Sequence, residues 1–273
     1  MYHSITFGDK NTWDDWRIVP SSRPVFNPPS LKRKLLDIPG ADGSIDLSES
    51  LTGYPVYTNR EGSLEFIVMN GYKQWYQAYS DIMDYLHGKT MRAILEDDRE
   101  YFYEGRFTIN EWKSSKDWSR IVIDYDLGPY KWLLHASLDD WEWNSFNFYT
   151  GIIPANKFKN ISVTGSNLRD SNSELIMDNL GNPIESTSIA HTFDKSLFGR
   201  APVCPSFIVS TVSGNGMYIR FINNELGIDI TKLVQNGTTQ IPEFLFLGDT
   251  VTIYFKCVSG TGTVSINFRQ GRL

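Results

Sequence analysis

In the sequence Ile121-Val122-Ile123-Asp124-Tyr125-Asp126-Leu127, every second residue is large and apolar. Successive side chains of a strand point to opposite faces of its sheet. This spacing therefore predicts a strand that buries the four odd-numbered residues and turns Asp124 and Asp126 toward solvent. Gly128-Pro129 follows and predicts the end of the strand. A half-buried strand of this kind indicates a mainly β fold.

Upstream of this strand the sequence predicts further strands and one helix. The predicted strands are residues 2–7, 63–68, 91–95 and 101–109. The predicted helix carries apolar residues at steps of three and four, followed by a C-terminal glycine, Gly88. These apolar residues are Tyr72, Trp75, Tyr76, Tyr79, Ile82, Met83 and Leu86.

Residues 8–59 show weak periodicity and contain prolines at positions 20, 24, 28, 29, 39 and 55. A stretch of this length without clear elements is uncommon inside a compact domain and is typical of an arm or a functional loop. We therefore expect extended segments here that reach beyond the domain.

After Trp132 no helical spacing recurs, and short predicted strands alternate with turns rich in Gly, Asn and Ser. Those strands are residues 159–164, 207–211, 217–223, 251–258 and 263–268, the last two joined by the expected hairpin loop Ser259-Gly260-Thr261-Gly262. The pattern predicts an antiparallel β-sandwich or jelly roll, galectin-like or like a carbohydrate-binding module. We expect two domains, 1–132 and 133–273, the first a β-barrel or sandwich with one α-helix.

Composition limits the function classes open to the chain. Its 273 residues carry a net charge of −6, which argues against a protein that binds nucleic acid by neutralising phosphates. No segment approaches the roughly 18 consecutive apolar residues of a membrane-spanning helix. Cys204 and Cys257 are expected to be free thiols in a protein made in the cytoplasm.

Sequence patterns of catalysis are missing. There is no GxSxG elbow, phosphate-binding loop or dinucleotide fingerprint, and the four histidines lack metal-ligand spacing. A glycosidase needs two carboxylates facing each other across a cleft. The acidic pairs are better explained as solvated turns, and they are Asp14-Asp15, Asp97-Asp98 and Asp139-Asp140 followed by Glu142. We expect no catalytic residue, cofactor or metal, and hence no enzyme.

Two groups of residues are candidates for binding. The basic run Lys32-Arg33-Lys34 and the turn residues Pro39, Gly40, Asp42 and Gly43 are predicted to dock partners. Trp141 and Trp143 could stack on sugar rings, although packing inside the protein is the commoner role of such residues. A carbohydrate-binding module or lectin-like protein that recognises cell-surface polysaccharide is therefore the alternative function.

Several segments, taken in order, resemble the distal tail (Dit) family of long non-contractile (siphophage) tails. They are Ile38-Pro39-Gly40-Ala41-Asp42-Gly43-Ser44-Ile45-Asp46-Leu47-Ser48, Tyr57-Thr58-Asn59-Arg60, Leu86-His87-Gly88-Lys89, Tyr103-Glu104-Gly105-Arg106-Phe107 after Asp97-Asp98, and Pro129-Tyr130-Lys131. The segment from Val264 to Arg269, then Gly271 and Leu273, is similar to the family's last strand. The likeness is most specific over residues 1–132.

The resemblance implies a structural component of the phage tail tip or baseplate, located in the virion. Its N-terminal domain would form a homo-hexameric ring that joins the tail tube protein to the tail-associated lysin or fibre. Its C-terminal domain would point outward, dock receptor-binding proteins and in some cases contact host surface polysaccharide. The acidic balance suits a channel for DNA, because an acidic wall does not hold phosphates.

Overall fold

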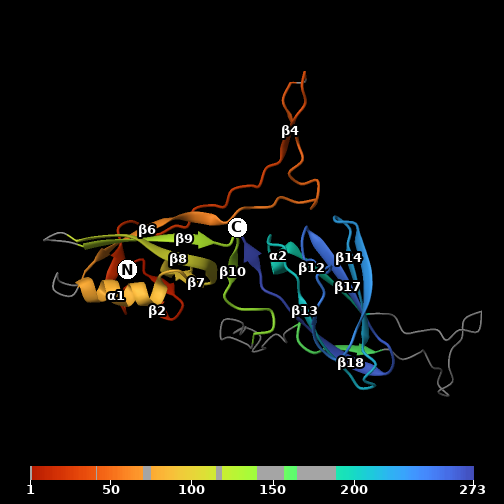
Figure 1. The fold of residues 1–273 in the computed structure, drawn as a ribbon. Helices are drawn as coiled ribbons and strands as arrows, with labels where there is room; N and C mark the ends of the chain where they lie inside the picture. Colours follow the sequence, from red (N-terminus) through yellow and green to blue (C-terminus); the bar gives the residue numbers. More distant parts are fainter. Residues whose placement is uncertain (1, 41, 70–74, 115–118, 140–156, 165–188) are drawn as a thin grey trace, which may run out of the picture. The chain divides into compact units, whose positions relative to one another are not determined.

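The computed structural model describes residues 2–40, 42–69, 75–114, 119–139, 157–164 and 189–273 (Figure 1). The chain forms two compact units, residues 1–134 with 272–273, and residues 135–271. The described parts of both units are built mainly from antiparallel strands, so the expected mainly β fold is confirmed.

The first unit is built around a curled sheet, whose main strands follow the order β2-β1-β7-β8-β9-β6-β3. Two short strands, β10 and β19, join it beside β8. The helix α1 packs against β8 (Figure 1). The bounds are β1 Ile5–Phe7, β2 Lys10–Asn11, β3 Ile18–Pro20, β6 Arg60–Val68, α1 Trp75–Leu86, β7 Lys89–Leu95, the 3-10 turn η1 Glu96–Asp98, β8 Tyr101–Ser114, β9 Ser119–Leu127, β10 Lys131–Leu133 and β19 Gly271–Arg272.

Strand β9 lies between β6 and β8 and organises the core of this unit. Ile123 is opposite Leu64 on β6 and Ile109 on β8, and all three side chains are buried. The next residue, Asp124, is opposite Ser63 and Thr108, on the other face of the sheet. The alternation in the sequence thus corresponds to one apolar and one polar face.

The predicted helix is present over the residues that the structure describes. Ala78, Ile82 and Leu86 form its buried stripe, at the spacing that one face of a helix requires. Gly88 has φ 73° and donates its amide hydrogen to the Phe107 carbonyl at 2.8 Å. Glycine adopts this left-handed conformation readily, so the chain can turn directly into β7.

The second unit contains two four-stranded antiparallel sheets, in the orders β11-β18-β13-β16 and β12-β17-β14-β15. Buried phenylalanines fill its core, with Phe221 and Phe244 stacked at 4.9 Å between ring centroids. Cys204, half-buried, and Cys257, buried, are free thiols, as expected. The bounds are β11 Ile161–Thr164, β12 Ile189–Asp194, β13 Ser206–Thr211, β14 Met217–Asn223, β15 Ile228–Val234, β16 Gly237–Gln240, β17 Thr250–Cys257 and β18 Thr261–Asn267.

Two expectations for this unit are wrong. The predicted hairpin between the last two strands does not form, because β17 and β18 belong to different sheets and the loop between them crosses from one to the other. Glycines that allow a tight hairpin also allow such a crossing, so the loop composition did not distinguish them. A short helix, α2 (Lys195–Phe198), is also present, and the Asp194 side chain caps it by accepting a hydrogen bond from the Ser196 amide.

Candidate assembly surface

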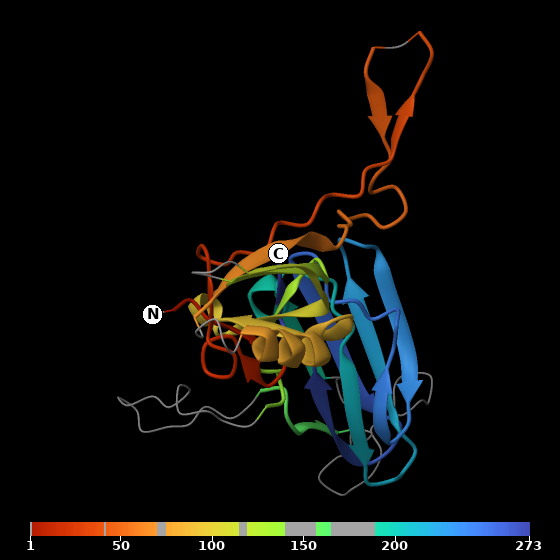
Figure 2. The same cartoon turned by 60° about the vertical axis from the view of Figure 1, so that its left-hand side comes forward.

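Residues 28–59 form a long two-stranded arm, here called the arm. Strands β4 (Leu35–Asp37) and β5 (Ser44–Asp46) pair antiparallel as a sheet of their own. Closer to the base, Thr58 donates its amide hydrogen to the Ser30 carbonyl, and Lys32 donates to the Val56 carbonyl, both at 2.8 Å. Figure 2 shows β4 and β5 at the end of these two branches. The proline-rich stretch is therefore a hairpin with both faces in solvent.

One face of the β4–β5 hairpin is apolar. Leu36 is directly opposite Ile45, and Ile38 and Leu47 follow two residues away on the same face. Between 36% and 49% of the surface of each of these four residues is exposed. The opposite face carries Leu35 among polar residues, including Asp37, Ser44 and Asp46. The arm therefore presents an unpartnered apolar stripe, here called the apolar face.

The sequence contained a signal for this hairpin that the analysis of periodicity missed. Leu36 and Ile38 alternate with polar or turn residues before the Pro39–Gly43 turn, and Ile45 and Leu47 alternate after it. Alternating apolar residues on both sides of a glycine turn are typical of a β-hairpin. The four residues of the apolar face were not among the docking residues predicted from the sequence.

Both groups of predicted docking residues lie on the arm. Pro39, Gly40, Asp42 and Gly43 form its exposed tip, where Gly40 has φ 84° and Gly43 has φ 76°. No atom lies within 4 Å of where a Cβ would stand at either glycine, so backbone conformation, not space, favours glycine there. The structure thus shows an accessible tip.

The basic run Lys32-Arg33-Lys34 is exposed on the branch that leads into β4. Lys34 bonds to the opposite branch through its backbone, donating to Ser48 Oγ and accepting from the Leu47 amide, both at 2.8 Å. Hydrogen bonds from Ser48, and to a smaller extent the charge of Arg33, lower the pKa of Asp46. The run is therefore partly balanced by acids of its own arm. Its role in docking stays a prediction.

Other candidates from the sequence do not form a site in the part of the chain described. Trp141 and Trp143 lie outside the described residues. His87 accepts a hydrogen bond from the Ile109 amide at 3.0 Å, and the residues described contain no group of His, Cys, Asp or Glu with the arrangement of a metal site. Among the same residues, no helix is long and apolar enough to cross a membrane.

The acidic pairs take part in local structure. Asp98 forms an ion pair with Lys131 at 2.6 Å, and Asp15 accepts a hydrogen bond from the Asn11 amide at 2.8 Å. Asp139 accepts from the Ala136 amide at 2.6 Å. Asp140 and Glu142 lie outside the described residues. Each acid described here thus fixes a turn or a neighbouring strand.

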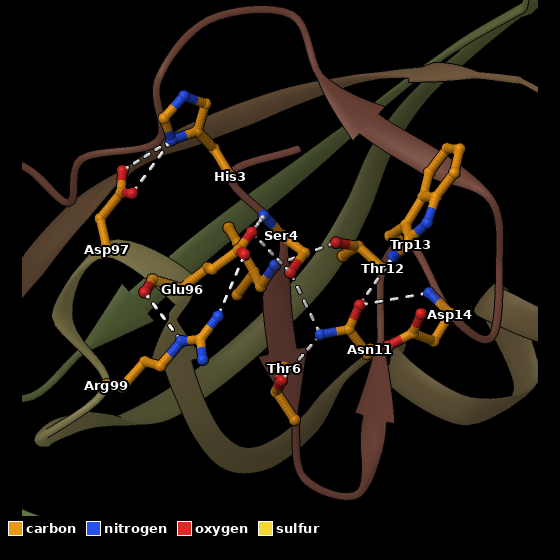
Figure 3. A network of polar contacts seen from close by, with 11 residues as sticks. His3, Ser4, Thr6, Asn11, Thr12, Trp13, Asp14, Glu96, Asp97 and Arg99 are labelled. Atoms are coloured by element: carbon orange, nitrogen blue, oxygen red, sulfur yellow. Dashed lines mark hydrogen bonds and ion pairs between the residues drawn. The ribbon is translucent and has the colours of Figure 1, made fainter. Parts of the chain in front are cut away.

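A network around β1 brings a serine, a histidine and acids together (Figure 3). His3 Nδ1 lies 2.8 Å from Asp97, which also accepts a hydrogen bond from Arg23. Burial acts to raise the pKa of Asp97, but these partners leave it lowered. Ser4 Oγ donates to Glu96 at 3.1 Å rather than to the histidine. Glu96 also accepts a hydrogen bond from the Ser4 amide at 2.8 Å, so the network fastens the start of β1 to η1.

Comparison with known proteins points to one fold. No protein-family model matches the sequence, and no curated protein sequence matches it. A solved structure does match, the crystal structure of the SPP1 Dit protein, described as a paradigm of the hub adsorption apparatus in phages that infect Gram-positive bacteria. The TM-score is 0.59 at 12% sequence identity, over 99% of each chain. The resemblance seen in the sequence is confirmed at the level of the fold, and the chain has the fold of a phage distal tail protein.

Proposed function

We propose that the chain is a structural, non-catalytic subunit of a phage tail tip or baseplate, forming a hexameric hub. In this proposal the first unit builds the ring, and the ring joins the tail tube protein to the tail-associated fibre or lysin. The second unit carries receptor-binding proteins or contacts the host surface. The fold shared with SPP1 Dit supports the assignment to a tail.

The observation that carries the proposal of assembly is the exposed apolar face of the arm. A two-stranded hairpin that packs on nothing is at best marginally stable in water. Leu36 and Ile45, paired across the hairpin, are 49% and 46% exposed. Burial of this face against a second copy stabilises the hairpin and joins two subunits in one step.

The length of the arm is compatible with the proposed ring. A branch of about 12 residues spans about 40 Å at the rise of a strand, which is long enough to cross a neighbouring domain. When each subunit uses its arm on one neighbour and receives the arm of another, the contact is heterologous. Heterologous contacts close into a ring when the rotation between subunits allows it.

The test is the mass of the purified chain by light scattering, with negative-stain images of the same peak. We expect a mass six times the 31.3 kDa of one chain and a ring whose channel admits duplex DNA. A chain that stays monomeric alone and together with its tail-tube and fibre partners would overturn the proposal. If that monomer bound cell-wall polysaccharide, the carbohydrate-binding alternative would replace it.

A further inference from the structure

The base of the arm contains a buried cation that the proposed ring contact does not use. Arg60, the first residue of β6, is 5% exposed. No carboxylate of the described residues forms an ion pair with it. Burial lowers the pKa of its guanidinium, because the charged form is less stable away from water. A buried charge of this kind is costly unless it makes hydrogen bonds that compensate for the lost water.

The guanidinium of Arg60 bonds to two segments that are distant in the sequence. Nη1 donates to the carbonyl of Asn27 at 2.9 Å, and Nε donates to the carbonyl of Pro129 at 3.0 Å. The group also lies 5.5 Å from the centre of the Tyr103 ring, a distance suited to a cation–π contact. Arg60 therefore joins the start of the arm, its end, and the chain just after β9.

Asn27 is fixed from three directions. Besides accepting from Arg60, it donates its amide hydrogen to Tyr125 Oη and its side-chain Nδ2 hydrogen to the Glu61 carbonyl, both at 2.9 Å. The preceding residue, Phe26, is buried, and its ring lies 4.6 Å from Tyr103 and 4.9 Å from Tyr125. The first residue before the arm is thus anchored to the core of the sheet.

Gly62 makes this close approach possible. A Cβ at this position would stand 2.4 Å from Tyr125 Oη and 2.5 Å from Asn27 Nδ2. Real Cβ atoms do not come so close, so any other residue would displace the ends of the Tyr125 and Asn27 side chains. The absence of a side chain at Gly62 is part of the geometry at the base.

We propose that Arg60 is the positioning residue of the arm, and that its bonds to Asn27 and Pro129 set the direction in which the arm leaves the domain before any neighbour binds. The inference rests on the proposed function, because it gives the arm of the ring subunit a fixed direction. Pre-set geometry lowers the entropy cost of association, since the arm need not be ordered during binding.

The direction of the arm can be measured by electron spin resonance in a protein that also carries Leu36→Asp and Ile45→Asp, the two changes expected to keep the subunit monomeric. One spin label replaces Leu51, which is 99% exposed on the arm, and a second replaces the exposed Gln77 on α1. Cys204 and Cys257 are removed so that labelling is specific. We expect a narrow distance distribution in the parent protein, and one about twofold wider in Arg60→Met.

Three further variants separate positioning from general stability. Arg60→Lys keeps the charge but lacks the planar fork that reaches two carbonyls, so it should also widen the distribution. Tyr125→Phe removes the hydroxyl that accepts from Asn27 and carries the test if Arg60→Met does not fold. Arg106→Met, at an exposed position of the same sheet, should leave the distribution unchanged.

A parent distribution as wide as that of the variants would overturn the inference, as would full rescue by lysine. Whether the chain forms a ring is decided by a separate measurement, the mass by light scattering. A six-fold ring built from subunits with a wide distribution would leave the proposed function standing without this inference. A narrow distribution in a chain that never assembles would support the positioning role of Arg60 and contradict the proposed function.

Discussion

Leu36 and Ile45 are directly opposed across the two-stranded arm, and about half of each side chain is exposed. A cross-strand apolar pair stabilises a hairpin most when a third surface covers it. In this chain that surface must come from another molecule if the ring proposal is correct. The pair is therefore the most direct place to test assembly.

Changing Leu36 and Ile45 together to Asp should abolish the ring while leaving each subunit folded. Exposed substitutions usually change the free energy of unfolding of the subunit itself by within about 0.5 kcal/mol. Because assembly adds to the apparent stability, the melting temperature is compared with that of the parent diluted until its ring dissociates, and the two should nearly agree. Light scattering measures the first effect and calorimetry the second. Leu35→Asp is the matched control, since Leu35 is 52% exposed on the opposite face of the hairpin. Rings that survive the double change would exclude the apolar face as the contact.

Phe107→Ala should strongly destabilise the first unit. Phe107 is fully buried on β8 and meets the Phe7 ring edge-on at 4.9 Å. Removing such a ring leaves a cavity and costs about 3–5 kcal/mol. Chemical denaturation followed by fluorescence measures the loss. If the variant unfolded at the same midpoint concentration of denaturant as the parent, the Phe107 side chain would not be part of the core.

Gly105→Ala should disrupt the β8–β9 pairing. A Cβ at Gly105 would stand 2.2 Å from the Asp126 carbonyl oxygen and 2.6 Å from Leu127 Cα, both backbone atoms that cannot move independently. Overpacking of this kind costs about 1–3 kcal/mol. Gly128→Ala is the control, because its nearest atom would be 3.6 Å away, an ordinary contact. Equal melting temperatures for the two variants would contradict the geometry.

His191 should make the second unit less stable in mild acid. Its Nε2 is buried without a hydrogen-bond partner among the described residues, and burial lowers its pKa below the ordinary 6.5. Well above pH 6.5 the imidazole is neutral in both the folded and the unfolded state and has no effect on stability. As the pH falls below that value, the unfolded chain binds a proton that the folded chain does not yet accept, so the free energy of unfolding decreases.

Replacing His191 with Leu removes this titrating group, and with it the difference in proton binding between the folded and unfolded states. The fall in melting temperature between about pH 7.5 and about pH 5 should be smaller in His191→Leu than in the parent. Differential scanning fluorimetry at both pH values gives the comparison. An identical fall in the two proteins would show that another group sets the acid sensitivity.

The sequence predicted the strands and the helix that bury one face against the core of their own chain and expose the other. Strand β9 and helix α1 alternate or repeat because Ile123 and Ile82 must meet a core while their neighbours meet water. Several of the segments that resemble a distal tail protein lie in or next to this core, whereas the first, Ile38–Ser48, lies on the exposed arm and the last lies mostly in the second unit. Burial of one face makes apolar residues recur at the period of the strand or helix, and both β9 and α1 show this spacing in the sequence.

The arm and its base were predictable only in part. An arm or functional loop was expected within residues 8–59, but no hairpin was assigned, because the alternation there is only two apolar residues long on each side of the turn, Leu36 and Ile38 before it and Ile45 and Leu47 after it. The bonds at the base join residues 33 and 98 positions apart, namely Asn27 with Arg60 and Asn27 with Tyr125. Contacts at such separations depend on the folded sheet and leave no local pattern.

The bond between Asn27 and Arg60 has a consequence for how such proteins diversify. Because the arm starts and ends at one point, residues 28–59 lie outside the register that ties β6 to β9. Lengthening a loop whose ends are already held together costs little, since closure entropy grows only slowly with length. Insertions and deletions within the arm should therefore change its length while leaving the sheet intact.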